Sequence, residues 1–221
     1  MTQAKRVNQA VNNGFVPPPG APLRARIAFR MLRLFGWRVA FDGRLPAPHG
    51  VIIAYPHTSN WDFPIGLLAI WTLNLPIRWI GKETLFRGWF GALAAPLLRR
   101  WGGRPVNRHA PSGAVGELAR LMQSEPAFWL ALSPEGTRRR LPYWRSGFYH
   151  LTRGLKVPLG LAYFDFDSRV VGIDEFVELS GDVAADMQHI AAVYAGRRGL
   201  HPELESVIAL DPAATAEPSA H

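Results

Sequence analysis

Short apolar runs alternate along most of the chain with longer segments of mixed character. The runs are "WRVAF", "VIIAY", "IRWIG", "AFWLAL", "VPLGLAYF" and "RVVGI", and "GGRPVNR" has the pattern of a further short strand that ends at Arg108. Segments with helical character separate them, at Trp61–Leu73, Trp89–Trp101, Ser112–Ser124, Trp144–Arg153 and Asp182–Arg198. Buried strands that alternate with helices predict an α/β fold, with a mostly parallel central sheet covered by helices on both faces.

An amphipathic helix is predicted before the first strand, over "LRARIAFRMLRLF" from Leu23 to Phe35. The apolar side chains that share one side are Leu23, Ile27, Met31, Leu34 and Phe35, and the arginines of a narrower flank are Arg26, Arg30 and Arg33. A basic amphipathic helix of this kind fits a membrane interface. The same periodicity also fits an ordinary surface helix packed on its own domain.

The chain of 221 residues is long enough for one sizeable core, so we expect a single folded domain. We predict a flexible leader over 1–22, the domain over 23–210 and a flexible tail over 211–221. The polar amino terminus lacks the apolar core of a signal peptide, which predicts a cytoplasmic protein. No window reaches the roughly 18 apolar residues that a spanning helix needs.

Arginine dominates the charge of the chain. The formal net charge is +8, and only three of the 25 Lys and Arg residues are Lys. This balance predicts attraction to polyanions, such as an anionic membrane surface, nucleic acid or a phosphorylated substrate, although coding bias alone also produces Arg-rich chains. The absence of Cys excludes disulfides, thiol nucleophiles and thiolate metal sites.

A candidate catalytic pair follows the run "VIIAY" in "YPHTSNWDF", where His57 precedes Asp62 by five residues. In parallel sheets the chemistry collects at the carboxyl ends of strands. A His at such an end can act as a general base, and a carboxylate that binds its other ring nitrogen fixes the tautomer. Ser59-x-x-Asp62 is also a capping box, in which the acid only closes the start of a helix.

A second candidate corner follows "AFWLAL", in "SPEGTRRR" from Ser133 to Arg140. Pro134 and Gly136 predict a tight turn that presents Thr137 and the following guanidinium groups to a ligand such as a phosphate. Three consecutive arginines also occur in solvated loops. Basic residues end two more predicted strands, and the predicted strand ends together carry His57, Lys82, Arg108, Glu135 and Arg138.

The order of these motifs resembles the glycerolipid acyltransferase family, the type that acylates lysophosphatidic acid at its 2-hydroxyl. The resemblance covers roughly residues 50–165: "HTSNWD" is similar to the family's H-x-x-x-x-D motif, "PEGTR" to its E-G-T-R block, and "KETLFRGWFG" and "GGRPVNR" to the blocks between them. It implies that His57 is the base and Asp62 its orienting partner. It also implies that the acceptor's phosphate site is shaped by Lys82, Arg108, Glu135, Gly136, Thr137 and Arg138.

The resemblance implies transfer of a fatty acyl group from an acyl thioester, carried on coenzyme A or acyl carrier protein, to a lysophosphatidic acid-like acceptor, with no further cofactor. The absence of a G-x-S-x-G elbow and of Cys favours direct transfer without a covalent enzyme intermediate. Such substrates imply a protein bound peripherally to the anionic inner face of the cell membrane. Departures from the family pattern bear on the acceptor: Pro56, Thr84, Trp89, Asn107, Ser133, Arg139 and Leu161.

Two other interpretations stay open: the same chemistry on another lyso-lipid, with a larger or amino-acid-containing headgroup, and a non-catalytic protein that binds anionic lipid. We expect no nucleic-acid binding, since the sequence lacks the known signatures. No metal is expected, because the remaining histidines lack ligand spacing and H-E-x-x-H is absent. Asp165 and Asp167 in "FDFD" are expected to face solvent.

Overall fold

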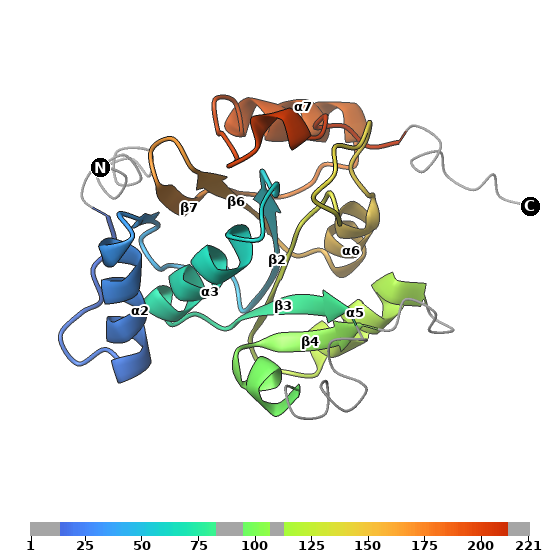
Figure 1. Ribbon diagram of the computed structural model, residues 1–221. Helices are drawn as coiled ribbons and strands as arrows, with labels where there is room; N and C mark the ends of the chain where they lie inside the picture. Colours follow the sequence, from blue (N-terminus) through green and yellow to red (C-terminus); the bar gives the residue numbers. More distant parts are fainter. Residues whose placement is uncertain (1–13, 83–94, 107–112, 212–221) are drawn as a thin grey trace, which may run out of the picture.

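The computed structural model describes residues 14–82, 95–106 and 113–211 (Figure 1). Its strands are β1 (Arg38–Ala40), β2 (His49–Tyr55), β3 (Ile77–Lys82), β4 (Gly103–Val106), β5 (Phe128–Leu132), β6 (Leu159–Asp165) and β7 (Val170–Val177). Its helices are α2 (Leu23–Leu34), α3 (Asp62–Leu73), α5 (Gly113–Gln123), α6 (Gly147–Leu155) and α7 (Val183–Val193), with a 3-10 turn at Pro202–Leu204. Residues 95–100 are also helical.

All seven strands join one sheet in the order β1-β7-β6-β2-β5-β3-β4. The pairs are parallel except for β6 and β7, which form an antiparallel pair. Helices cover both faces: α2 and α3 lie on one, and α5, α6 and α7 on the other (Figure 1). The predicted α/β class and mostly parallel sheet are therefore confirmed. The carboxyl ends of β2 and β5, which are neighbours, lie side by side.

Strand β2 shows how the sequence builds the two layers. Val51, Ile53 and Tyr55 point into the core shared with α6 and α7, whereas Ile52 and Ala54 point toward α3. Successive residues of a strand face opposite sides of the sheet, so a strand buried on both faces has to be apolar throughout. This requirement explains why "VIIAY" and the runs like it could be recognised as buried strands.

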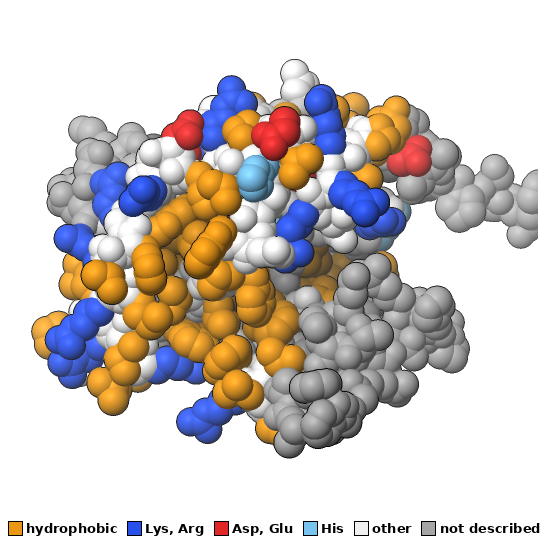
Figure 2. Space-filling view, viewed as in Figure 1, with side chains coloured by type: hydrophobic (Ala, Val, Ile, Leu, Met, Phe, Trp, Pro, Cys, Tyr) orange, Lys and Arg blue, Asp and Glu red, His pale blue; other side chains and the backbone are white. Residues whose placement is uncertain are grey.

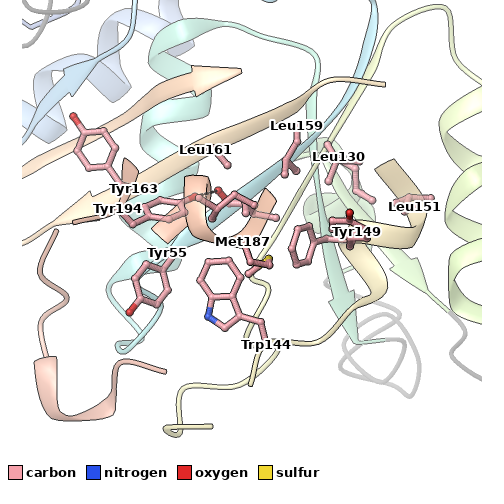
Figure 3. Close-up of a cluster of buried hydrophobic side chains, with 14 of the residues drawn as sticks. Tyr55, Leu130, Trp144, Tyr149, Leu151, Leu159, Leu161, Tyr163, Met187 and Tyr194 are labelled. Atoms are coloured by element: carbon pink, nitrogen blue, oxygen red, sulfur yellow. Dashed lines mark hydrogen bonds between the residues drawn. The ribbon is translucent and has the colours of Figure 1, made fainter. Parts of the chain in front are cut away.

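Aromatic side chains close the core on the side of α6 and α7 (Figure 3). The ring of Tyr55 lies 5.1 Å from Trp144 and 5.3 Å from Tyr194, between ring centroids. Tyr194 is fully enclosed, and its hydroxyl donates to the carbonyl oxygens of Ile53 and Ala162. Tyr55 is therefore anchored immediately before the turn that carries His57.

Helix α2 buries a narrow face and exposes a wide one. Ala25, Ala28 and Leu32 are buried, and Leu32 packs in one cluster with Ile65 and Ala69 of α3. The larger apolar residues of the predicted stripe stay exposed, and Leu34 is 81% exposed. Packing on α3 thus accounts for the small residues of α2, and the stripe of Leu23, Ile27, Met31, Leu34 and Phe35 is left uncovered in this structure.

Several boundaries and one burial differ from the sequence-based expectations. Helix α6 starts at Gly147, three residues later than predicted, and α7 ends at Val193 instead of Arg198. Asp165 was expected to face solvent, which is wrong: it ends β6, is 9% exposed and accepts a hydrogen bond from Ser168 Oγ at 2.6 Å. Asp167 is exposed, as predicted.

None of the helices within the described ranges combines the length and the hydrophobicity of a segment that crosses a bilayer. The division into leader, domain and tail stays a prediction. Phe15, in the expected leader, donates its backbone N–H to the Val39 carbonyl at 2.7 Å.

The carboxylate of Glu125 links β3 to β4 near the amino-terminal ends of these strands, away from the aromatic core. Glu125 accepts hydrogen bonds from Arg104 at 2.6 Å and from Arg78 at 2.8 Å. Burial acts to raise the pKa of Glu125, but the two Arg hydrogen bonds outweigh it and hold the pKa below the ordinary 4.5. A depressed carboxyl pKa contributes stability that is present above pH 4.5 and is lost as the pH falls through the lower folded-state pKa.

Glu125→Gln should therefore lower the free energy of unfolding at neutral pH by about 1 kcal/mol, a value reduced for the partial exposure of the group. The difference from the wild type should shrink as the pH falls below 4.5. Urea denaturation of both proteins at neutral and acidic pH measures this. Equal stability at neutral pH would show that the two ion pairs contribute nothing.

Candidate active site

The turn between β2 and α3 brings His57 and Asp62 together. Nδ1 of His57 lies 3.1 Å from Oδ2 of Asp62, which is the first residue of α3 and only 1% exposed. The same Oδ2 accepts the backbone N–H of Ser59 at 2.9 Å. One oxygen of Asp62 thus binds the backbone before the helix and contacts the imidazole, so the geometry fits both of the roles that the sequence left as alternatives.

This contact assigns the two ring nitrogens of His57. A carboxylate only accepts hydrogen bonds, so Nδ1 carries the proton in the contact with Asp62, and Nε2 is left as the basic nitrogen. The His57 side chain is 21% exposed, whereas Asp62 is shielded from solvent. The pair can therefore take a proton from a hydroxyl group that approaches Nε2.

The turn after β5 meets the His57 turn through two hydrogen bonds. Strands β2 and β5 are parallel neighbours, with Ile53 opposite Leu132, so both turns leave the sheet at the same edge. Glu135 Oε2 accepts the backbone N–H of His57 at 2.9 Å. Arg138 Nε donates to the Ser59 carbonyl oxygen at 3.0 Å. The two sequence motifs therefore lie next to each other at the carboxyl ends of β2 and β5.

Glu135 is buried beneath the His57 turn and binds backbone N–H groups with both oxygens of its carboxylate. It is 1% exposed, and its Oε1 accepts the backbone N–H of Ser206 at 3.2 Å. Burial raises the pKa of Glu135 above the ordinary 4.5, and the hydrogen bonds from Ser206 and from the His57 N–H offset this only in part. A carboxylate enclosed in this way does not reach a ligand, so its contribution to an acceptor site is to hold the protein around it.

The remaining residues of the predicted phosphate site lie at the surface of the β5 turn. Gly136 has a φ of +63°, a left-handed conformation that favours Gly, and donates its N–H to the Ser133 carbonyl. Thr137 Oγ1 accepts the N–H of Arg139 at 3.3 Å. Arg138 is exposed, and in the described part of the chain its Nη groups have no partner. Its guanidinium is thus available to an anionic group.

Two predicted site residues cannot be placed. Lys82 ends β3 opposite Val106 of β4, but its side chain lies outside the described residues, as does the whole of Arg108. Among the residues described, no three His, Asp or Glu side chains gather in a way that could hold a metal ion. The expectation that the enzyme uses no metal stays a prediction.

An apolar cavity of about 200 Å³ opens beside the catalytic pair, between α3 and the sheet. His57, Asp62 and Ser133 line it together with apolar or small side chains, among them Ile52, Leu67, Ile70, Ala131, Leu132 and Ile173. A cavity lined in this way favours a hydrocarbon group over a polar one. The basic nitrogen and an apolar binding space therefore share one site.

Sequence reasoning missed the residues that approach this site from the carboxyl-terminal part of the chain. Thr58 Oγ1 accepts the N–H of His201 at 3.1 Å, and Ser206 binds Glu135 as described above. These contacts lie 143 and 71 residues apart in the sequence. The stretch "GLHPELESV" carries no motif or periodicity that could have indicated them.

Comparisons with known proteins identify the family of the chain and a structure with a similar fold. The sequence model of the acyltransferase family matches residues 38–159, more than half of the chain, and the chain belongs to this family. The fold resembles the crystal structure of the 1-acyl-sn-glycerophosphate (LPA) acyltransferase PlsC from Thermotoga maritima, with a TM-score of 0.51 and 16% sequence identity over 79% of this chain and 80% of that one. A comparison with curated proteins gave no match.

Proposed function

We propose that this acyltransferase moves a fatty acyl group from an acyl thioester to the hydroxyl of a lysophosphatidic acid-like acceptor, as in glycerophospholipid synthesis. The observation that carries the proposal is the contact of His57 with Asp62 at the wall of the apolar cavity, with the Arg138 turn beside it. The cavity suits the hydrocarbon chain, the imidazole suits the hydroxyl, and the guanidinium suits a phosphate.

The reaction follows from the positions of these groups. Nε2 of His57 removes the proton of the acceptor hydroxyl as its oxygen attacks the thioester carbonyl carbon. The tetrahedral intermediate collapses, the carbon–sulfur bond breaks, and the thiolate takes the proton back from the imidazolium. Asp62 keeps the ring oriented through Nδ1 and stabilises its positive charge. The thioester, on coenzyme A or on acyl carrier protein, is a co-substrate, and the proposal needs no other cofactor.

A bilayer surface is proposed as the place where the enzyme meets these substrates. Hydrophobic side chains gather on the face of the molecule that carries α2 and α3 (Figure 2). The uncovered stripe of α2 adds further exposed apolar side chains, and Arg26, Arg30 and Arg33 are exposed on the same helix. Each Arg near an anionic surface adds about 1 kcal/mol of attraction. We therefore place the enzyme on the anionic inner face of the cell membrane.

His57→Ala should lower acyl transfer by roughly 10²- to 10⁴-fold, the usual contribution of a general base. The measurement is product formation from a radiolabelled acyl thioester, with a panel of lyso-lipids that includes larger and amino-acid-containing headgroups. His150→Ala, an exposed His on α6, is the matched control and should behave as the wild type. Wild-type turnover by His57→Ala would remove this residue from the mechanism, and binding without product from any acceptor would favour the non-catalytic alternative.

Arg138→Ala should raise the KM for a phosphorylated acceptor about tenfold, because a phosphate would lose a charged hydrogen bond. The KM for the same acceptor without its phosphate should change little. Arg120→Ala, which removes an exposed guanidinium from α5, controls for the loss of charge. If the KM values for the two acceptors rise equally, Arg138 acts by holding the Ser59 carbonyl and does not bind phosphate.

Leu34→Glu should weaken binding to anionic vesicles roughly tenfold or more, since a buried Leu side chain contributes about 1.5–3 kcal/mol. Flotation with vesicles at low salt measures this binding. Leu200→Glu, at a residue that is 41% exposed in the segment after α7, makes the same chemical change outside the stripe. Equal flotation of Leu34→Glu and the wild type would mean that α2 does not enter the membrane.

A further inference from the structure

The segment that follows α7 runs against the turn that carries His57. We define it as the strap, residues 199–210. It lies outside residues 38–159, the part of the chain that the family model matches. The strap contacts the residues on both sides of His57 and also the carboxylate that binds the His57 backbone.

The first contact is a close approach of the Gly199 backbone to the side chains of Thr58 and Pro56. A methyl group placed on Gly199 would lie 2.5 Å from Thr58 Oγ1 and 3.2 Å from Pro56 Cβ. Two residues later, the N–H of His201 donates to the same Oγ1 at 3.1 Å. Thr58 is 3% exposed, so it is enclosed between the turn and the strap. The residues before and after His57 are thus both fixed from this side.

The second contact acts through Glu135. Ser206 donates its N–H to Oε1 of Glu135, whose Oε2 accepts the N–H of His57. Ser206 itself is tied to both turns: its Oγ accepts the N–H of Leu141 at 3.0 Å, and its carbonyl accepts the hydroxyl of Tyr55 at 3.1 Å. Ser206 and Glu135 are 4% and 1% exposed, so water does not compete for these bonds.

We propose that the strap positions His57 for catalysis, with Glu135 and Ser206 as positioning residues that act through the His57 backbone and never touch substrate. The proposal rests on the proposed role of His57 as the base. The turn is held by a hydrogen bond from the His57 backbone N–H and by contacts of the strap with the side chains of Pro56 and Thr58, which restrict the movement of the His57 backbone. Asp62 then fixes the side-chain torsions of His57 through Nδ1. A general base has to lie within hydrogen-bond reach of the proton that it removes. A turn at a strand end is more mobile than the strand, so further contacts are needed to keep the base in this position.

Two pairs of variants test the strap. Glu135→Gln replaces one carboxylate oxygen by an NH₂ group, so that one of the two backbone N–H donors faces another donor. Glu125→Gln is its control, since it disrupts two charged hydrogen bonds of the same sheet at the amino-terminal ends of β3 and β4. Gly199→Ala presses a methyl group on Thr58 and Pro56. Its control is Gly154→Ala in α6, where the methyl group meets nothing within 4 Å.

We expect Glu135→Gln and Gly199→Ala to lower kcat, by up to about 10²-fold for a shift of the base near 1 Å, while the KM for acceptor stays close to wild type. The controls should keep wild-type kcat. Hydrogen–deuterium exchange, followed in the peptide that spans residues 55–60, should speed up in the two test variants and stay unchanged in the controls. A variant that destabilises the whole protein would raise exchange in β5 and β6 as well.

Wild-type kcat and wild-type exchange in both test variants would overturn the proposal. A rise in acceptor KM alone for Glu135→Gln would also overturn it, because Glu135 would then contact the acceptor. Full activity of His57→Ala refutes the proposed role of His57 as the base instead. In that case the exchange experiment still decides whether the strap fixes the His57 turn.

Discussion

The hydrogen bond from the backbone N–H of His57 to the buried carboxylate of Glu135 is the contact on which the site depends. Together with the hydrogen bond from Arg138 to the Ser59 carbonyl, it ties the turn after β2 to the turn after β5, its parallel neighbour. Enclosing a carboxylate disfavours its charged form, which is why burial raises the pKa of Glu135. The structure tolerates this because two backbone donors bind the carboxylate, one from His57 and one from Ser206.

Asp62 illustrates that a hydrogen bond at a helix start and a contact with an imidazole need not compete for the same carboxylate. Its Oδ2 accepts the Ser59 N–H and lies against Nδ1 of His57, so the first turn of α3 and the orientation of the imidazole are set by one atom. The hydrogen bond from the Ser59 N–H fixes the position of the Asp62 carboxylate, and the carboxylate in turn fixes the orientation of the His57 ring. Local helix chemistry thus supplies the rigidity that a general base needs.

The cavity and helix α2 lie on the same side of the sheet, the side that α3 covers. Helix α3 covers the cavity beside His57, and α2 packs on α3 while exposing its stripe. A site that opens between α3 and the sheet suits the long hydrocarbon chains of the substrates that we propose.

The sequence by itself determined the strands, the sheet class and the pairing of His57 with Asp62, because each depends on residues that are close in sequence. Strands buried on both faces must be apolar at every position, and His57 and Asp62 are joined by a single turn. Tertiary structure decided the rest. Helix α7 ends early because Tyr194 turns into the core, and the chain then returns along the site. Asp165 and Glu135 are buried by residues distant in sequence, and Glu135 binds Ser206, which is also distant. The energy of such contacts depends on how these segments pack in space, which a local sequence pattern does not show.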